Sequence, residues 1–426
     1  MNSKFKFFVL AICLVFSSFQ ALASSILLPM DNEGQQNHLK AYGITYWALA
    51  KSYKVNWLLN YRGGSFLLPD GEDIRKECQI RGVSFEVLTD GATASILEEI
   101  SSPSQNMETV VLEKAPKIAV YTPKGKQPWD DAVTMVLTYA EIPYTEIYDE
   151  EVLSDQLVLY EWLHLHHEDF TGQYGKFFGN YRNAPWYIQQ KLEAEALAKK
   201  LGFNKVSEEK RAVATKIRDY VIGGGFMFAM CSATDSFDIA LSAENTDICE
   251  PMFDGDASEP NYQAKIDYSN TFAFKDYILE KQPMKYEFSD IDTTEEHGKG
   301  SFSMEVDYFT LMDFSAKWDP IPTMLCQNHT QIVKGFMGQT TAFAPDKIKS
   351  NVLLMGECKI NGEARYIHGQ KGKGMFTYYG GHDPEDYQHR VGDAPTVLDL
   401  HPNSPGYRLI LNNVLFPAAR KKKLKT

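Results

Sequence analysis

Apolar and polar positions follow two different periods along this chain, one typical of strands and one typical of helices. Short apolar runs, such as residues 55–59 (Val-Asn-Trp-Leu-Leu) and 117–121 (Lys-Ile-Ala-Val-Tyr), predict buried strands. Between such runs, apolar residues recur every three or four positions, as in residues 36–51 and 130–142, and this spacing predicts helices. Strands that alternate with helices indicate an α/β fold with a mostly parallel sheet.

The same pattern divides the chain into segments. The pattern predicts an N-terminal α/β segment, built on a βαβ unit, at residues 24–115. It also predicts one α/β core in two parts, at residues 116–246 and 350–417. Residues 247–349 lose the alternation and are acidic, aromatic and rich in turn residues. Because long excursions of this kind are usually functional or mobile, they predict an insertion or lid on the active edge of the sheet. The basic residues 418–426 predict a solvated tail.

Residues 1–23 have the composition of a secretory signal. Lys4 and Lys6 precede the apolar run 7–16, and Ala21-Leu22-Ala23 is a small-residue cleavage site. We therefore expect a mature chain that begins near Ser24 and is periplasmic or secreted. The apolar run is too short for a permanent membrane anchor, and no later stretch is long and apolar enough to form a transmembrane segment.

Charge and cysteine content narrow the expected partners. The formal net charge of −13 argues against nucleic acid as a partner, so a small-molecule substrate is expected. The cysteines that remain after the predicted cleavage are Cys78, Cys231, Cys249, Cys326 and Cys358. Their odd number leaves at least one thiol unpaired and is compatible with two disulfides and a free Cys231. None of them forms a C-x-x-C pair, which disfavours a structural zinc site.

Cys231 is the first candidate for a reactive residue. It ends an all-apolar predicted strand and precedes a helix predicted to begin near Ser236. A strand-to-helix turn presents one side chain at the carboxyl edge of a parallel sheet, close to the free N–H groups of the next helix, which favour a thiolate. Ser232 and Asp235 in the same turn are candidate substrate-binding residues. The alternative is a buried structural thiol at the end of a strand.

A glycine-rich turn supplies a candidate base for this cysteine. The predicted strand 374–379 ends in Gly-Gly-His382, and an elbow on a neighbouring strand would face that turn. A histidine oriented by a carboxylate can deprotonate a thiol and later protonate a leaving amine. His382 is therefore the expected base, with Glu385 or Asp383 as the group that orients it. The alternative is a polar turn without a catalytic role.

A histidine cluster keeps a different chemistry open. Five candidate substrate-binding residues follow one another at the end of a predicted strand: His164, His166, His167, Glu168 and Asp169. Alternation along a strand places the even-numbered residues on one face and the odd-numbered residues on the other. A His-x-His pair has metal-ligand spacing, so zinc or another divalent metal would use His164 and His166 with Asp169 or His382. Without a metal, the cluster forms a wall of the active cleft or has a purely structural role.

Two glycine-rich stretches stand out: Tyr220-Val-Ile-Gly-Gly-Gly-Phe226, followed by Cys231-Ser-Ala-Thr-Asp-Ser236, and residues 372–383. They resemble the ThuA-like trehalose-utilisation family, which belongs to the class I glutamine amidotransferase-like superfamily. The resemblance implies a doubly wound, flavodoxin-like sheet, a ligand site above the elbow and a link to carbohydrate metabolism. ThuA-like chains tend to carry His at the elbow, so Cys231 is closer to a true amidotransferase nucleophile. True amidotransferases place Glu two residues after the His, whereas here Glu385 comes one position later.

The N-terminal stretches 28–31, 37–43 and 57–64 also resemble exported bacterial proteins labelled asparagine synthetase B. That label implies glutamine hydrolysis and ATP-dependent amide transfer. However, no cysteine begins the predicted mature chain, and no Ser-Gly-Gly-x-Asp-Ser loop is present to bind pyrophosphate.

Three functional hypotheses follow. The first is a Cys-dependent hydrolase without a cofactor that acts on an amide or ester, with Cys231 as nucleophile and His382 as base. The second is a metal-dependent hydrolase or isomerase that uses His164 and His166. The third is a non-catalytic carbohydrate-binding module. We expect the first, because it gives a role to both the elbow and the glycine-histidine turn.

Overall fold

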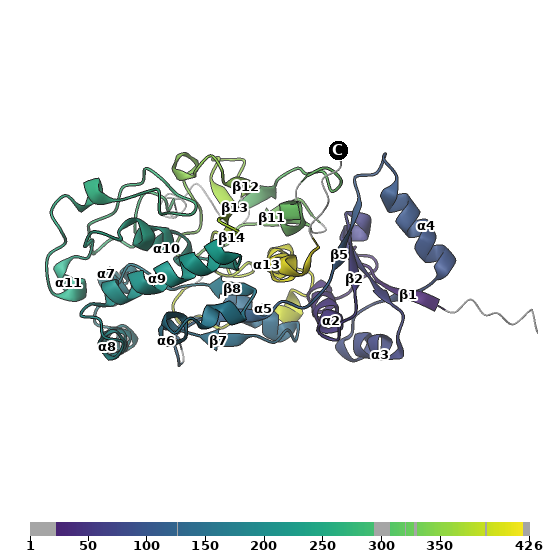
Figure 1. Ribbon diagram of the computed structural model, residues 1–426, viewed down its shortest axis with the longest axis horizontal. Coiled ribbons are helices and arrows are strands. Elements are labelled where there is room, and N and C mark those ends of the chain that lie inside the picture. Colours follow the sequence, from purple (N-terminus) through teal and green to yellow (C-terminus); the bar gives the residue numbers. More distant parts are fainter. Residues whose placement is uncertain are drawn as a thin grey trace, which may run out of the picture.

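The computed structural model describes residues 23–125, 127–293, 307–319, 321–327, 330–387 and 390–420. The chain forms a smaller N-terminal lobe and a larger lobe, side by side along the long axis of the molecule (Figure 1). Each lobe contains one sheet with helices, and both antiparallel and parallel pairings occur, so the fold is mixed α/β. The predicted signal lies outside the described residues apart from Ala23, where β1 begins.

The smaller lobe contains an antiparallel sheet. Its elements are β1 (Ala23–Leu28), α2 (His38–Ala50), β2 (Val55–Leu59), β3 (Ser65–Pro69), α3 (Glu72–Arg81), β4 (Glu86–Thr89), α4 (Asp90–Ser101) and β5 (Glu108–Leu112). The strand order is β4-β1-β3-β2-β5, and every neighbouring pair is antiparallel. The expected βαβ unit is therefore divided, because β3 lies between β1 and β2. The turn at Arg62, which has a left-handed φ of 44°, connects β2 to β3 as a hairpin.

The larger lobe contains a nine-stranded mixed sheet. Its first elements are β6 (Ile118–Tyr121), α5 (Ala132–Tyr139), β7 (Thr145–Ile147), α6 (Asp149–Leu153), β8 (Trp162–Leu165), α7 (Phe178–Tyr181), α8 (Pro185–Lys200), α9 (Val206–Gly223), β9 (Phe226–Met230) and α10 (Ala233–Ser242). It continues with α11 (Pro251–Asp254), β10 (Tyr308–Leu311), β11 (Ile332–Lys334), β12 (Leu353–Glu357), β13 (Ala364–Lys371), β14 (Gly374–Tyr379) and α13 (Pro405–Leu415). The strand order is β11-β10-β12-β13-β14-β9-β8-β6-β7. The pairs from β14 to β7 are parallel, and the pairs from β11 to β14 are antiparallel.

Two segments differ from the sequence-based expectation. The apolar run at residues 157–165 predicts one buried strand, but β8 begins only at Trp162, because residues 156–159 form a 3-10 turn in which Val158 is 80% exposed. Alternating apolar residues alone do not distinguish such a turn from a strand. The segment 247–349 also contributes to the sheet itself, since β10 and β11 pair with each other and β10 pairs with β12.

Helices cover both faces of the parallel strands. Val120, Trp162 and Phe228 belong to the apolar core that includes α5 and α13. Leu163 and Met227, their neighbours along the same strands, belong to the core that includes α9 and α10. Because successive side chains of a strand point to opposite faces, strands buried on both sides need the continuous apolar runs seen in the sequence.

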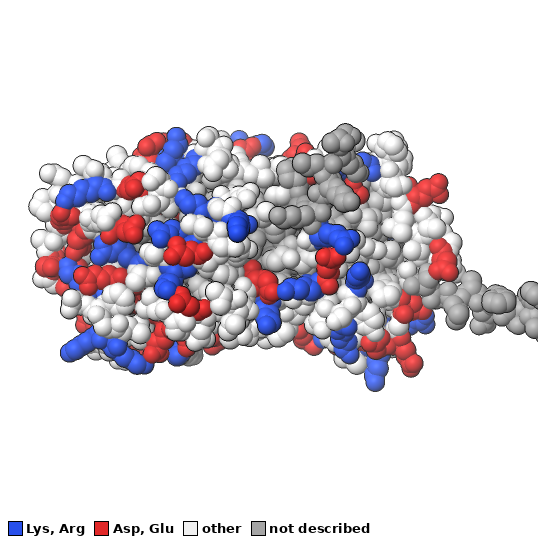
Figure 2. Space-filling view, in the orientation of Figure 1, with Lys and Arg blue, Asp and Glu red and all other residues white. Residues whose placement is uncertain are grey.

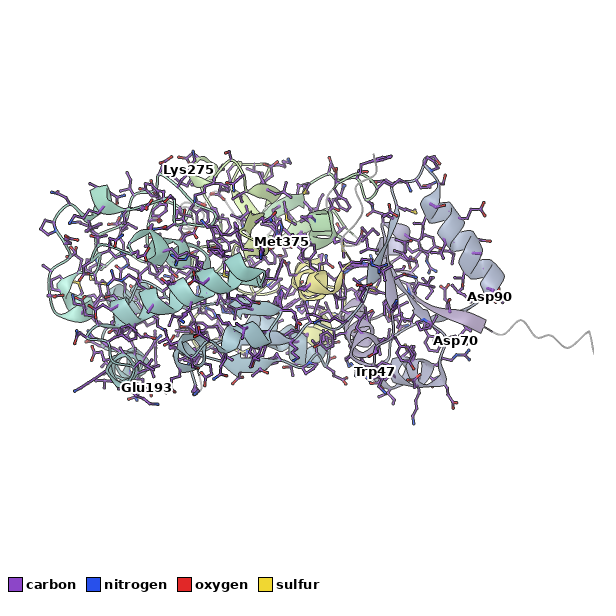
Figure 3. All side chains as sticks on the ribbon, in the orientation of Figure 1. Trp47, Asp70, Asp90, Glu193, Lys275 and Met375 are labelled. Atoms are coloured by element: carbon purple, nitrogen blue, oxygen red, sulfur yellow. The ribbon has the colours of Figure 1, made fainter. Side chains whose placement is uncertain are left out.

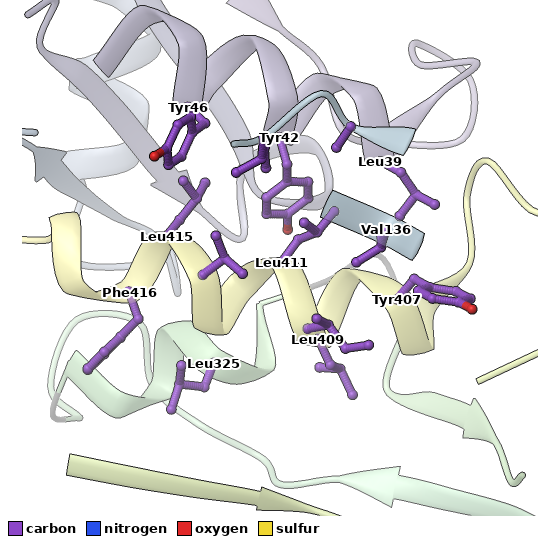
Figure 4. Packing of buried hydrophobic residues seen from close by; sticks show 14 of the residues in the cluster. Leu39, Tyr42, Tyr46, Val136, Leu325, Tyr407, Leu409, Leu411, Leu415 and Phe416 are labelled. Atoms are coloured by element: carbon purple, nitrogen blue, oxygen red, sulfur yellow. The ribbon is translucent and has the colours of Figure 1, made fainter. Parts of the chain in front are cut away.

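Helix α13 joins the two lobes. Figure 4 shows α13 packed beneath Tyr42 and Tyr46 of α2, with Leu411 and Leu415 directed toward them. The Tyr42 hydroxyl donates a hydrogen bond to Asn412 Oδ1 at 2.5 Å, within this buried contact. The apolar core is therefore continuous between the lobes.

On the face shown in Figure 2, Lys and Arg side chains are interspersed with Asp and Glu side chains. Among the described residues, no helix has the length and apolar character that crossing a membrane requires. All five described cysteines are buried free thiols, so the two disulfides that their number allowed are absent from this part of the chain.

Candidate functional site

The candidate site lies where the order of the parallel strands reverses. The chain passes from β6 outward to β7, then returns to β8 on the other side of β6. In open α/β sheets, ligands bind at the carboxyl ends of the strands at such a reversal, because the two loops diverge there. The loops that follow β6 and β8, residues 122–131 and 166–177, form this part of the molecule.

Cys231 occupies the turn between β9 and α10, where the sequence placed it. Its φ of 54° is left-handed, a conformation that costs a non-glycine residue about 1–3 kcal/mol. The thiol is only 2% exposed and donates a hydrogen bond to Gln339 O at 3.3 Å. Burial raises the pKa of Cys231 to about 12, and the carboxylates of Asp235 and Asp292 add to the rise. The thiol is therefore protonated in this conformation.

The segment 336–341 covers the elbow. The Gln339 side-chain amide donates hydrogen bonds to Gly175 O at 2.8 Å and Tyr286 O at 3.0 Å. Thr340 has a φ of 51°, which is rare for a β-branched residue. Its hydroxyl donates to Asp235 Oδ1 at 3.0 Å, and its backbone N–H donates to Asp292 Oδ2 at 3.2 Å. The elbow and the segment that covers it thus each contain a residue with a strained backbone, Cys231 and Thr340. Such strain is concentrated at functional sites.

Replacing Asp235 by Asn should remove a pH dependence of stability. Burial, with a contribution from Asp292, raises the pKa of Asp235 well above its usual value. Its stabilising contribution is therefore complete below the unfolded pKa near 4 and is lost as the pH rises through the folded pKa. Urea unfolding at pH 5 and pH 8 should show a smaller loss of stability for Asp235→Asn than for the wild type. An equal loss in both proteins would contradict this assignment.

Three imidazole rings converge beside the elbow, at the ends of β8 and β14. The ring centroids of His166 and His167 lie 3.8 Å apart, and the ring of His382 lies 4.5 Å and 4.1 Å from them, respectively. The Nε2 atoms of His167 and His382 are separated by 2.5 Å. His166 and His382 are 2% and 0% exposed, whereas His167 is half-buried, so the contact between His167 and His382 is partly buried.

The structure corrects the expected orientation of the histidines on β8. Alternation placed His166 and His167 on opposite faces, but the strand ends at Leu165 and the two rings stack on each other. His164 remains within the strand, and its Nδ1 contacts Phe228 O at 3.2 Å. The period of two holds only while the backbone is extended, so it does not apply beyond Leu165.

Asp131 connects the histidines of β8. Its Oδ2 lies 2.9 Å from His166 Nδ1 and 3.1 Å from His164 Nε2. Asp131 is also the N-cap of α5 and accepts a hydrogen bond from the Thr134 N–H at 2.8 Å. Although burial alone would raise it, the pKa of Asp131 is held well below its usual value by His166 and His164. Asp131 was not among the site residues expected from the sequence, although Asp before a predicted helix is typical of an N-cap.

The other predicted acidic residues contact different groups. Glu385 pairs with His401 at 3.2 Å, and Asp383 accepts a hydrogen bond from the Glu385 N–H. Asp169 accepts hydrogen bonds from the Thr171 N–H at 2.6 Å and the Gly175 N–H at 3.0 Å. Asp383 and Asp169 therefore accept hydrogen bonds within their own turns, and Glu385 pairs with a histidine from a later segment.

Two further residues predicted from the sequence, Ser232 and Glu168, lie next to the histidine cluster. The Ser232 hydroxyl donates a hydrogen bond to His167 O at 2.9 Å and so links the elbow to the loop after β8. Glu168 contacts the Tyr148 hydroxyl at 3.5 Å, and burial raises its pKa to about 7. Trp129, which the sequence analysis did not select, lies 5.3 Å from the His167 ring.

The histidines can hold a metal ion. His166, His167 and His382 each offer one ring nitrogen, and these atoms all lie within 4.8 Å of one another. Asp131, His164 and His166 form a second group of the same kind. Three histidines that leave one position open are a common zinc ligand set in enzymes, and a carboxylate behind a ligating histidine fixes its tautomer. The donor set therefore fits zinc.

Comparisons with known proteins assign no family. No family model and no curated protein matches the sequence. Among solved structures, the chain is similar to two cytoplasmic proteins of Salmonella typhimurium. One shares 10% identity, with 72% of this chain and 100% of that chain covered and a TM-score of 0.33. The other shares 12% identity, with 71% and 100% covered and a TM-score of 0.32. A β-galactosidase from Bacillus circulans shares 10% identity, with 68% of this chain and 31% of that chain covered and a TM-score of 0.26.

Proposed function

We propose that this protein is a metal-dependent hydrolase whose metal ligands are His166, His167 and His382. The observation that carries the proposal is the convergence of the three rings, whose ring nitrogens all lie within 4.8 Å of one another. Three imidazole nitrogens at this spacing can bind one metal ion. A shared cation gives the three nitrogen lone pairs a common partner.

The residues around the three histidines favour ring positions and tautomers that would suit zinc binding. Asp131 Oδ2 lies 2.9 Å from Nδ1 of His166, a position that would favour the tautomer whose Nε2 is free to bind a metal. The Asp130 carbonyl, 3.0 Å from His167 Nε2, can only accept a hydrogen bond, so it favours a proton on that nitrogen, and His167 would bind a metal through Nδ1. When bound, zinc supplies a Lewis acid that polarises a carbonyl and acidifies water. The ring of Trp129 limits access to His167 from the side of α8.

The fold supports a site at this position. The order β7-β6-β8-β9-β14 corresponds to the order 2-1-3-4-5 of flavodoxin-like doubly wound sheets, which bind ligands at the reversal. We further propose that the core has the ThuA-like architecture of the class I glutamine amidotransferase-like superfamily. We also propose that the protein is exported from the cell and that its substrate is an amide or ester.

A second candidate function is the Cys-dependent hydrolase. The observation that favours it is the left-handed backbone of Cys231 at a strand-to-helix turn, which is the geometry of a nucleophile elbow. In this conformation, however, the thiol donates its hydrogen bond to Gln339 O. Reaction at Cys231 therefore requires the segment 336–341 to move.

Metal analysis combined with three variants separates the two functions. We expect about one zinc per wild-type chain after reconstitution, and ester hydrolysis that is lost on chelation and restored by zinc. His382→Ala should abolish both metal binding and turnover, whereas His401→Ala, a half-exposed histidine paired with Glu385, should preserve both. Cys231→Ser should keep zinc and activity. A metal-free protein whose turnover resists chelators and disappears in Cys231→Ser would replace the first function by the second.

A further inference from the structure

A cavity of about 380 Å³ opens beside the histidines. It is lined by the loops after β6 and β8, by the start of α6 and by α8 and α9. Its wall includes Pro128, which precedes Trp129, and Glu168, which follows His167. The cavity therefore lies at the same reversal of the strand order and is large enough for a small organic ligand.

In the wall of this cavity, the lysines have ion-pair partners, but two of the glutamates have none among the described residues. Lys210 Nζ pairs with Asp149 at 2.8 Å, and Lys124 Nζ pairs with Glu151 at 3.0 Å, so both lysines already have carboxylate partners. In the described part of the chain, neither Glu168 nor Glu193 of the same wall has an ion-pair partner. Glu168 accepts a hydrogen bond only from the Tyr148 hydroxyl and Glu193 one from Gln189 Nε2 at 2.6 Å among the described contacts, so both carboxyl groups can still face a positively charged ligand. Because burial raises the pKa of Glu168 to about 7, a bound ammonium group would favour its ionised form.

Aromatic rings complete the wall. Trp186, Tyr174 and Tyr148 line the cavity. Tyr148 and Tyr174 already have a lysine Nζ over their rings, Lys210 at 4.3 Å and Lys191 at 5.3 Å. Trp186 has no such partner in the described structure, and indole is the aromatic ring that binds cations most strongly. The rings and carboxylates together match an ammonium group.

A chain of rings connects the cavity to the histidines. The ring of Trp186 lies edge-on to Trp129 at 5.5 Å, and Trp129 lies 5.3 Å from His167. A ligand held against Trp186 is therefore separated from the histidine site by a single indole.

We propose that this cavity binds a protonated amine of the substrate, between Glu168 and Trp186 with Glu193 at its mouth. The assignment of the ligand as substrate rests on the proposed hydrolase function, whereas binding of an ammonium group does not. The substrate is then an amide or ester that also carries an ammonium group. An aromatic face contributes about 0.5–2 kcal/mol to such binding, depending on how dry the contact is.

Calorimetric titration with 1,4-diaminobutane and with its uncharged counterpart 1,4-butanediol tests this proposal. We expect the diamine to bind at least tenfold more tightly than the diol to the full-length protein at low salt. Glu168→Gln and Trp186→Leu should each weaken diamine binding at least fivefold. The matched controls are Glu195→Gln, a neighbour of Glu193 on α8 that pairs with Lys191, and Trp47→Leu, which lies in the other lobe (Figure 3). Both controls should leave diamine binding unchanged.

The same titration on zinc-loaded and chelator-treated protein separates this inference from the proposed function. Diamine binding that survives removal of zinc, in a protein that also lacks turnover, supports the cavity and rejects the hydrolase. Equal affinity for diamine and diol, no binding of either, or undiminished binding in Glu168→Gln and Trp186→Leu would each overturn the inference, even in a protein with one zinc per chain. Circular dichroism of each variant establishes that it is folded before titration.

Discussion

Replacing Lys210 by Met is expected to lower the free energy of unfolding by about 3–5 kcal/mol, because it leaves a buried carboxylate without its counter-ion. Lys210 is 4% exposed and Asp149 is 1% exposed. The ammonium group also donates hydrogen bonds to the hydroxyls of Tyr121 and Tyr148, both at 3.0 Å. These contacts join α9 to β6 and α6, so the loss acts on the framework of the candidate site. Urea unfolding at pH 7 followed by circular dichroism measures the effect.

Lys216→Met is the control, because Lys216 lies on the same helix but forms a largely exposed pair with Asp155. Exposed pairs contribute about 0–1 kcal/mol, so this variant should remain close to the wild type. Adding Asp149→Asn to Lys210→Met should recover part of the loss, since the carboxylate that lost its counter-ion is then removed. The pKa of Lys210 is raised, so its own contribution is complete below the unfolded pKa near 10.4, and a measurement at pH 7 lies within that range. A loss below about 1 kcal/mol would contradict the role of this ion pair.

Local sequence patterns predicted most elements of the larger lobe but not the arrangement of the first sheet. The runs around β6, β9 and β14 are apolar on both faces, and strands covered by helices on both sides require that composition. By contrast, β3 and β5 are short strands next to a glycine turn and a polar loop, so their apolar residues gave no clear period. Their insertion beside β2 depends on contacts distant in sequence, which periodicity does not contain.

The candidate site shows the same limit. The elbow at Cys231 and the histidines at 164–167 and 382 were recognisable, because each stands at the end of an apolar run. Their pairing was not recognisable, because the partner of His382 depends on where β14 lies in the sheet and where β8 ends. Asp131 belongs to a helix start that is ordinary in sequence, and only the reversal of strand order brings it to His166. Residues whose role depends on tertiary position thus escaped the sequence analysis.

Replacing Asp131 by Asn should weaken zinc binding about 10–100-fold, which is the usual effect of removing a carboxylate behind a ligating histidine. Asn is as good an N-cap as Asp, so α5 should keep its start. The free energy of unfolding of the metal-free protein should then fall only by the loss of the carboxylate's contacts to His166 and His164, which hold its pKa below the usual value. Competition with a fluorescent zinc chelator measures the affinity, and urea unfolding of the metal-free protein measures the fold.

If Asp131 had a purely structural role, Asp131→Asn would change the free energy of unfolding and leave the zinc affinity unaltered. A positioning role lowers the zinc affinity as well, because the charge that orients His166 and His164 is lost while the helix cap is retained. Asp131→Ala removes both functions and should therefore lower zinc affinity and stability together, the latter by about 0.5–2 kcal/mol. Zinc affinity that is equal in the wild type and Asp131→Asn would mean that Asp131 does not support the three-histidine site, and that the tautomer of His166 is set by another contact.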